Sequence, residues 1–245
     1  MTRAGPPPAG QAVRERAGPT RRRGRPAVFL DRDGTLVEEV PYLHEPDRVA
    51  LLPGVGGALR ALAAAGFALV VVTNQAGVAR GHYGEAAVAA VHRRLAVLLR
   101  AEGVRLDGIW YCPHHPDGTV AAYARACRCR KPAPGLLEAA AGALGLDLGR
   151  SWLVGNHPSD VAAGAAAGVT PLFVSTGDGA TRAPPPGTPA LPDLAAAAGV
   201  VLGCPVVAAP PSGRPTGPPR WEEAGPWGGA GAEHRPERRP GPPRP

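Results

Sequence analysis

The chain has 245 residues, of which 44% are hydrophobic, so it can build one large domain or two small ones. Its formal net charge of +7 comes from its ends, because residues 1–25 contribute +6 and residues 205–245 contribute +2, leaving −1 for the middle. The basicity therefore gives no reason to expect a folded nucleic-acid-binding domain, and no apolar run reaches the ~18–20 residues of a membrane helix.

The two ends differ in composition from the middle. Residues 1–25 are mainly Pro, Gly, Ala and Arg, and residues 205–245 are rich in Pro and Gly. Such segments bury too little apolar surface to offset the entropy of ordering. We therefore predict a disordered basic tail at 1–25, one folded domain at 26–204 and a disordered tail at 205–245. Because no apolar segment follows the first arginines, the sequence predicts a cytoplasmic protein with free thiols.

The middle of the chain alternates between predicted strands and helices. Apolar or β-branched runs predict strands, and amphipathic segments bounded by Pro or Gly predict helices. In chain order, the predicted strands are 27–31, 67–74, 106–112, 151–156 and 170–176. The predicted helices are 53–66, 84–103, 132–145, 159–168 and 192–203. Unbroken apolar strands separated by helices predict an α/β fold, a Rossmann-like three-layer sandwich with a mostly parallel sheet.

Polar side chains gather where the predicted strands end. They are Asp31, Asp33, Thr73, Asn74, Asn156 and Asp160, with Lys131 shortly before a helix. In a parallel sheet these ends face one crevice, so four separated segments are expected to form one site. Asp31 and Asp33 can face one reacting group together, because side chains at i and i+2 of an extended segment point the same way. The alternative for DRDG is an ordinary Asp-containing turn.

Two further features of these residues indicate phosphate chemistry. Asp31, Asp33, Asn156 and Asp160 supply oxygen atoms of the kind that magnesium prefers. Lys131 is the single lysine beside 26 arginines. A compact ammonium binds phosphate as a point charge, which a planar guanidinium does not replace. The alternative is that one lysine survives by chance.

Three of the four cysteines lie within 18 residues, in the pattern Cys-x-His, twelve residues, Cys-x-Cys. The predicted ligands of a closed structural zinc site are Cys112, His114, Cys127 and Cys129. Disulfides fit poorly because three cysteines leave one unpaired. His115 is an alternative to His114, and Cys204 is expected to be inert. A metal here would fix Arg130 and Lys131 at the rim of the pocket.

Four motifs resemble those of the haloacid dehalogenase phosphohydrolase superfamily. They are FLDRDGTL, VVVTNQ, CRKPAPG and VGNHPSDVAAGAAAG, in that family's order. The resemblance implies that Asp31 attacks phosphorus to form an aspartyl-phosphate and that Asp33 is the general acid and base. It implies that Thr73 and Lys131 stabilise the phosphoryl group. It also implies magnesium between Asp31 and the phosphate, with the carbonyl of Asp33 as a further ligand.

Two longer stretches narrow this resemblance. CPHHPDG…CRCRKP and TNQAGVARG are similar to segments of bacterial D-glycero-D-manno-heptose 1,7-bisphosphate 7-phosphatases, which have no large cap domain. That family implies a small sugar phosphate substrate, heptose biosynthesis and a monomer. The substrate-binding residues carried over by position are Glu39, Tyr42, Thr73, Asn74, Gln75, Arg130 and Lys131. The forked guanidinium of Arg130 suits a second phosphate. The alternatives to substrate binding are that Tyr42 packs against other side chains and that Glu39 is a solvated surface residue.

The fourth motif departs from the family. It usually begins Gly-Asp, whereas this chain reads GNHPSD, with Asn156 at the metal position and His157 where a basic substrate contact often lies. An amide oxygen still binds magnesium, but the lost charge predicts weaker binding unless Asp160 compensates. The alternatives are a phosphatase for histidinol phosphate or another small phosphomonoester, a low-turnover phosphate-binding protein, and a nucleic-acid 3′-phosphatase. We expect neither a nucleic-acid nor a membrane partner.

Overall fold

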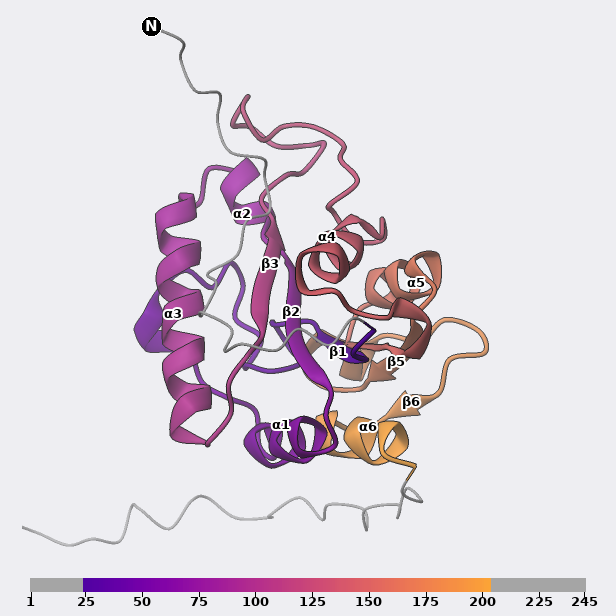
Figure 1. Cartoon of the computed structure of the whole chain (residues 1–245). Coiled ribbons are helices and arrows are strands. Elements are labelled where there is room, and N and C mark those ends of the chain that lie inside the picture. Colours follow the sequence, from indigo (N-terminus) through magenta and orange to yellow (C-terminus); the bar gives the residue numbers. More distant parts are fainter. Residues whose placement is uncertain (1–23, 204–245) are drawn as a thin grey trace, which may run out of the picture. The chain divides into compact units, whose positions relative to one another are not determined.

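The structure is a computed structural model, and it describes residues 24–203 (Figure 1). Most of the two predicted tails, and Cys204, lie outside the described residues. Arg25, which we assigned to the N-terminal tail, lies within them and makes tertiary contacts. Its guanidinium forms an ion pair with Asp107 (2.9 Å) and donates to the backbone carbonyl of Gly66. The described domain thus starts slightly before the predicted boundary.

Six parallel strands form one sheet in the order β3-β2-β1-β4-β5-β6. The strands are β1 (Ala27–Leu30), β2 (Ala68–Asn74), β3 (Gly108–Cys112), β4 (Trp152–Gly155), β5 (Thr170–Val174) and β6 (Ala190–Leu191). Leu30, the last residue of β1, pairs with Val71 of β2 and Val154 of β4. The segments that follow these three strands therefore converge at one edge of the sheet.

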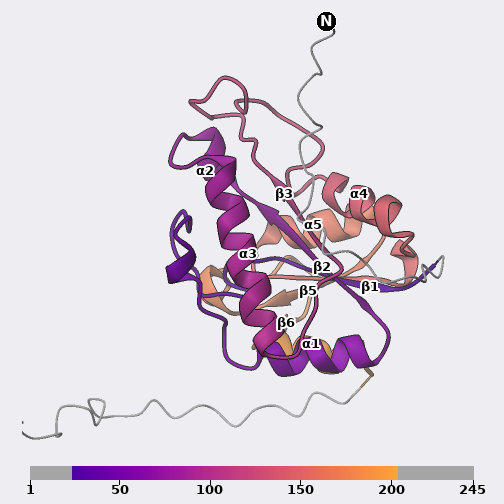
Figure 2. The ribbon, with the colours of Figure 1, turned by 60° about the vertical axis from the view of Figure 1, so that its left-hand side comes forward.

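Helices cover both faces of the sheet (Figures 1 and 2). One layer contains α1 (Val55–Ala64), α3 (Glu85–Ala101) and α6 (Leu194–Val201), and the other contains α4 (Gly135–Leu144) and α5 (Pro158–Ala167). Alternate residues of β1 enter the two cores: Val28 and Leu30 pack in the first, and Ala27 and Phe29 pack in the second. The predicted three-layer sandwich is confirmed.

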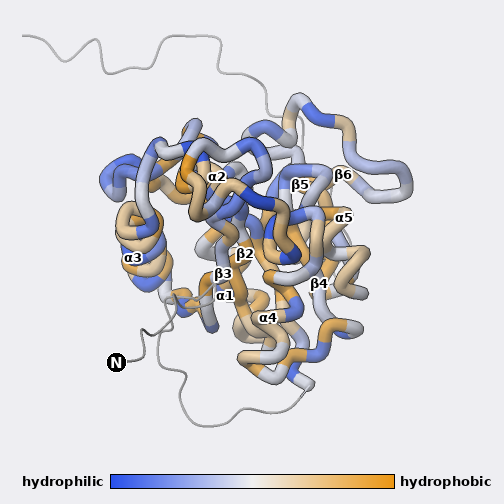
Figure 3. The backbone as a smooth tube through the Cα atoms, turned by 90° about the horizontal axis from the view of Figure 1, so that it is seen from above, coloured by the Kyte–Doolittle hydropathy of each residue, from blue (hydrophilic) through white to orange (hydrophobic). Residues whose placement is uncertain are grey.

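The helix α3 shows why the sequence folds this way. Hydrophobic and hydrophilic residues alternate along its turns (Figure 3), and Val88, Val91, Leu95 and Leu99 are buried on one side. Each such side chain contributes roughly 1.5–3 kcal/mol by leaving water. Within residues 24–203, every helix is too short or too polar to cross a membrane.

Five short elements were not predicted. They are α2 (Ala76–Ala79), β6 and the 3-10 turns Pro46–Arg48, Leu148–Arg150 and Gly177–Thr181. Each is too short to leave a periodic pattern of its own. Two of them matter for the site, because α2 follows β2 and the last 3-10 turn follows β5, next to the residues that end β1 and β4.

Candidate active site

A cavity of about 890 Å³ lies at the carboxyl ends of the strands. All the residues that we assigned to catalysis, magnesium or substrate line it: Asp31, Asp33, Glu39, Tyr42, Thr73, Asn74, Gln75, Arg130, Lys131, Asn156 and Asp160. The structure therefore brings residues from four separated segments to one cavity. The contacts of each side chain indicate what it can do chemically.

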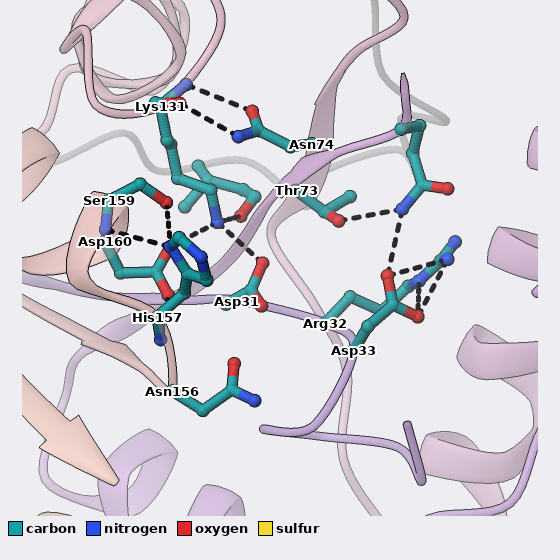
Figure 4. A network of polar contacts seen from close by, with 12 residues as sticks. Asp31, Arg32, Asp33, Thr73, Asn74, Lys131, Asn156, His157, Ser159 and Asp160 are labelled. Atoms are coloured by element: carbon teal, nitrogen blue, oxygen red, sulfur yellow. Dashed lines mark hydrogen bonds and ion pairs between the residues drawn. The ribbon is translucent and has the colours of Figure 1, made fainter. Parts of the chain in front are cut away.

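Lys131 lies at the base of the cavity with its side chain almost fully buried. Its Nζ is 2.6 Å from Asp31 Oδ1 and 2.6 Å from Asp160 Oδ1, and it donates to the Val72 carbonyl (Figure 4). Burial alone would lower the pKa of Lys131, but the charges of Asp160 and Asp31 together raise it. The amide of Asn74 holds the backbone N–H and carbonyl of Lys131 with two hydrogen bonds of 3.0 Å.

Asp31 follows β1 directly and faces this ammonium. Burial raises its pKa to about 7, the nearby charges of Asp160 and Asp33 add to the effect, and Lys131 offsets it only in part. Two carboxylates, Asp31 and Asp160, thus contact one ammonium group, which leaves an excess of negative charge. The oxygen of the Asn156 amide points toward Asp31 (Figure 4). A negatively charged group of oxygen atoms such as this fits magnesium.

Asp33 is held by two residues that the sequence did not single out for this purpose. Arg32 Nη2 lies 2.9 Å from each oxygen of the Asp33 carboxylate, and Gln75 Nε2 donates to it at 3.1 Å. Gln75 also donates to Thr73 Oγ1 (2.9 Å) and accepts from Tyr83 Oη (3.0 Å). Arg32 is only 1% exposed, and its position between two aspartates was the signal that could have revealed it.

The helix α5 begins where the fourth motif departs from the family. Asp160 Oδ2 accepts from the His157 N–H (3.0 Å), and His157 Nδ1 accepts from the Ser159 N–H (3.1 Å), which together form a capping box. Both oxygens of Asp160 are therefore engaged, one here and one by Lys131. Burial lowers the pKa of His157, so the ring is neutral at pH 7 and carries its proton on Nε2.

Arg130 is one of the residues that line the cavity, whereas Arg80 contacts a lining residue, Tyr42. Arg80 Nη1 donates to Tyr42 Oη (2.6 Å), and its Nη2 lies 3.4 Å from His115 Nε2. Burial, and to a smaller extent the neighbouring guanidinium of Arg80, lower the pKa of Arg130. The two guanidinium groups are thus like charges that act on each other, and a bound anion would relieve this repulsion. Arg80 lies in the TNQAGVARG stretch that narrowed the resemblance, but the sequence analysis gave it no role in the site.

Four side chains, one from the end of β3 and three from the loop between β3 and α4, converge at a second site. Cys112, His114, Cys127 and Cys129 each present a ligand atom within 4.8 Å of the others, and neighbouring atoms lie 3.2–3.7 Å apart. A tetrahedral zinc with Zn–S bonds of about 2.3 Å places its sulfur ligands about 3.7 Å apart, so the cluster fits zinc. Hydrogen bonds from Cys112 lower the pKa of Cys129 to about 5, which favours the ligating thiolate. His115 lies outside the cluster and accepts from the Asp117 N–H.

Comparison with known proteins gives the family. A D-glycero-beta-D-manno-heptose-1,7-bisphosphate 7-phosphatase from Yersinia pestis is 46% identical over 153 residues, which cover 62% of this chain and 81% of that protein. The chain belongs to this phosphatase family. The protein of the same name from Escherichia coli strain K12 is also 46% identical, over 62% of this chain and 80% of its own length.

Two other comparisons agree with this membership. The HAD-hydrolase-like family matches residues 128–197. The crystal structure of D,D-heptose 1,7-bisphosphate phosphatase from B. bronchiseptica, complexed with magnesium and phosphate, superposes with a TM-score of 0.64 at 36% identity, covering 73% of this chain and 98% of that one. The protein is thus a phosphatase of the haloacid dehalogenase superfamily, as its four motifs implied.

Proposed function

We propose that this phosphatase removes the 7-phosphate of D-glycero-D-manno-heptose 1,7-bisphosphate, as a step in heptose biosynthesis. One observation carries the proposal: a single cavity has a buried ammonium beside a carboxylate at its base and a second cationic group at its rim. Lys131 and Asp31 suit the phosphate that reacts, and Arg130 with Arg80 suits the one that stays. The names of the relatives support the same substrate.

The chemistry follows from groups already next to each other. A carboxylate oxygen of Asp31 attacks phosphorus, forming an O–P bond as the bond to the sugar oxygen breaks. Asp33 gives its proton to that leaving oxygen and then takes one from the water that hydrolyses the aspartyl-phosphate, releasing inorganic phosphate. Lys131 and the Thr73 hydroxyl stabilise the charge of the transferring group. Arg32 and Gln75 hold the Asp33 carboxylate toward it.

Asp31, the carbonyl of Asp33 and Asn156 would hold magnesium, which supplies the positive charge that lets a phosphate dianion approach a carboxylate. Both oxygens of Asp160 already have partners, so we assign it to positioning Lys131 and capping α5. Asn74 and Gln75 were predicted to bind substrate. Their amides bond to Lys131, Asp33 and Thr73, so we assign them to positioning these groups.

The remaining parts of the chain complete the proposal. Cys112, His114, Cys127 and Cys129 would hold a structural zinc that shapes the loop before Arg130. Residues 26–204, preceded by Gly24 and Arg25, would form the catalytic domain of a cytoplasmic monomer, between tails without a folded core. The compositions of residues 1–25 and 205–245 support this organisation.

The test is phosphate release from each anomer of heptose 1,7-bisphosphate by purified protein with magnesium, with histidinol phosphate in parallel. We expect release from one heptose anomer, and 31P NMR of the product should retain the C1 phosphate and lose the C7 phosphate. Asp31→Asn is the control for contaminating phosphatases. Preference for histidinol phosphate would overturn the substrate, and silence on all three substrates by a folded, zinc-containing protein would favour the phosphate-binding alternative.

A further inference from the structure

Glu39 makes contacts that a substrate-binding or solvated residue would not need. Its Oε2 accepts from Asn156 Nδ2 at 3.0 Å and from the Asp178 backbone N–H at 2.6 Å. Asn156 is itself 3% exposed, and its Nδ2 also donates to the Thr176 carbonyl at 3.2 Å. The segments after β1, β4 and β5 thus meet at one pair of side chains.

Two glycines close around this pair. A Cβ atom on Gly34 would overlap Asn156 Nδ2 and the Glu39 carboxylate, and one on Gly177 would overlap the same carboxylate. Both glycines have positive φ, +70° and +53°, so each is suited to its position by backbone conformation as well as by space. The Thr176 hydroxyl donates to the Gly34 carbonyl and joins the two backbones. Asn156 therefore has little room to rearrange, and Glu39, although an exposed residue, has one carboxylate oxygen held in the same place.

An amide group can turn either end toward the cavity, and its neighbours decide which. A carboxylate only accepts hydrogen bonds, and so does a backbone carbonyl, so both partners of Asn156 Nδ2 require the NH2 group on their side. The amide oxygen is then the end that remains for the cavity, where it points toward Asp31 (Figure 4). The Glu39 carboxylate and the Thr176 carbonyl thus fix the orientation of the Asn156 amide together.

We propose that Glu39 is a positioning residue, whose carboxylate fixes the Asn156 amide with its oxygen toward the metal site and places a negative charge one hydrogen bond away. The metal part of this proposal rests on the proposed magnesium site, whereas the coupling of the two side chains does not. It predicts that residues 39 and 156 cannot be exchanged independently. Asn156→Asp alone would set two carboxylates about one hydrogen bond apart, whereas adding Glu39→Gln would supply an amide that donates to the new carboxylate.

The experiment is a double-mutant cycle of Glu39→Gln and Asn156→Asp, with thermal unfolding in magnesium-free buffer and magnesium titration calorimetry. Coupled sites give non-additive effects, and independent sites give additive ones. We expect Glu39→Gln to lower Tm when residue 156 is Asn and to raise it when residue 156 is Asp, each by at least ~2–4 °C. With Asn156 in place, it should also weaken magnesium binding about 5–10-fold, the loss of one charge-assisted hydrogen bond.

Glu38→Gln is the matched control, because Glu38 lines the same cavity and loses the same charge. Its effect on Tm should be the same in both backgrounds. Glu39→Gln acting equally in both backgrounds would overturn the proposal, and so would magnesium affinity that falls no more than in Glu38→Gln. If the Asn156→Asp variants fail to fold, the magnesium affinities of Glu39→Gln and Glu38→Gln, both with Asn156 in place, test the proposal. Coupled Tm values in a protein that hydrolyses no heptose bisphosphate would refute the proposed substrate alone.

Discussion

Replacing Lys131 by methionine should strongly destabilise the magnesium-free protein. Methionine keeps most of the length of the side chain and removes its charge. In the native protein the ammonium lies between Asp31 and Asp160, at 2.6 Å from an oxygen of each. Leaving a buried carboxylate without its partner costs about 3–5 kcal/mol of unfolding free energy. We expect a loss of that size at pH 8.

The loss should shrink as the pH falls. Asp31 already has a pKa of about 7 with Lys131 present, and without the ammonium its pKa rises further. A carboxyl group whose pKa is higher in the folded than in the unfolded state binds more protons when folded, so stability decreases as the pH rises through that interval. At pH 5 the folded variant takes up a proton, which relieves the repulsion with Asp160. The variant should therefore approach the wild type in acid.

Urea unfolding at pH 5 and pH 8 in magnesium-free buffer measures both values. Arg128→Met is the control, because Arg128 lies in the same loop but forms an exposed ion pair with Glu138, which is worth no more than about 1 kcal/mol. A Lys131→Met variant within about 1 kcal/mol of the wild type at pH 8 would refute this account of the buried cluster. A loss that does not depend on pH would refute the part assigned to Asp31.

Three further predictions concern the active site and the zinc cluster. The first concerns the difference in unfolding free energy between the wild type and Asp31→Asn. The pKa of Asp31 is raised to about 7 from 3.8, so the wild type should lose stability relative to this variant as the pH rises from about 4 to about 7. Parallel urea titrations that show a constant difference would contradict this prediction. Arg32→Lys replaces a fork on both oxygens of Asp33 by a single donor, so we expect a loss of about 1–3 kcal/mol by urea unfolding and an altered pH–rate profile. Cys127→Ser should lower both Tm and the zinc content, which elemental analysis measures. An unchanged zinc content would show that Cys127 is not a zinc ligand.

The sequence predicted the fold because its strands are unbroken apolar runs with helices between them. It also placed the site, since the polar residues that end parallel strands share one edge of the sheet. Asp31, Thr73 and Asn156 were all found in this way, and the structure brings them to one cavity. The cluster of three cysteines and one histidine was predicted from spacing alone, because three thiols and an imidazole in a short segment are typical of a tetrahedral zinc site, and the structure brings the four ligand atoms within 4.8 Å of one another.

The positioning residues could not be assigned from the sequence. Asn74 and Lys131 are 57 residues apart in the chain, and Glu39 and Asn156 are 117 apart. Their hydrogen bonds depend on strand order and on loop conformations that leave no periodic signal. The sequence therefore named Asn74 and Glu39 as residues near the substrate, and the structure showed that their side chains have protein partners.

The protein partners of Lys131 and Arg130 indicate that losing zinc would affect the positions of these two residues differently. Lys131 is held from β2 by Asn74 and Val72 and from the cluster of carboxylates, so its position does not depend on the zinc loop alone. Arg130 follows Cys129 directly, and within residues 24–203 the hydrogen bond of its guanidinium goes to the His114 carbonyl, at 3.4 Å. Zinc loss in Cys127→Ser should therefore displace Arg130 while the reacting groups stay in place. If Arg130 binds the second phosphate, KM for a sugar bisphosphate should rise, whereas kcat, and KM for a monophosphate, should change little. An equal fall in kcat for both substrates would show that the loop positions Lys131 after all.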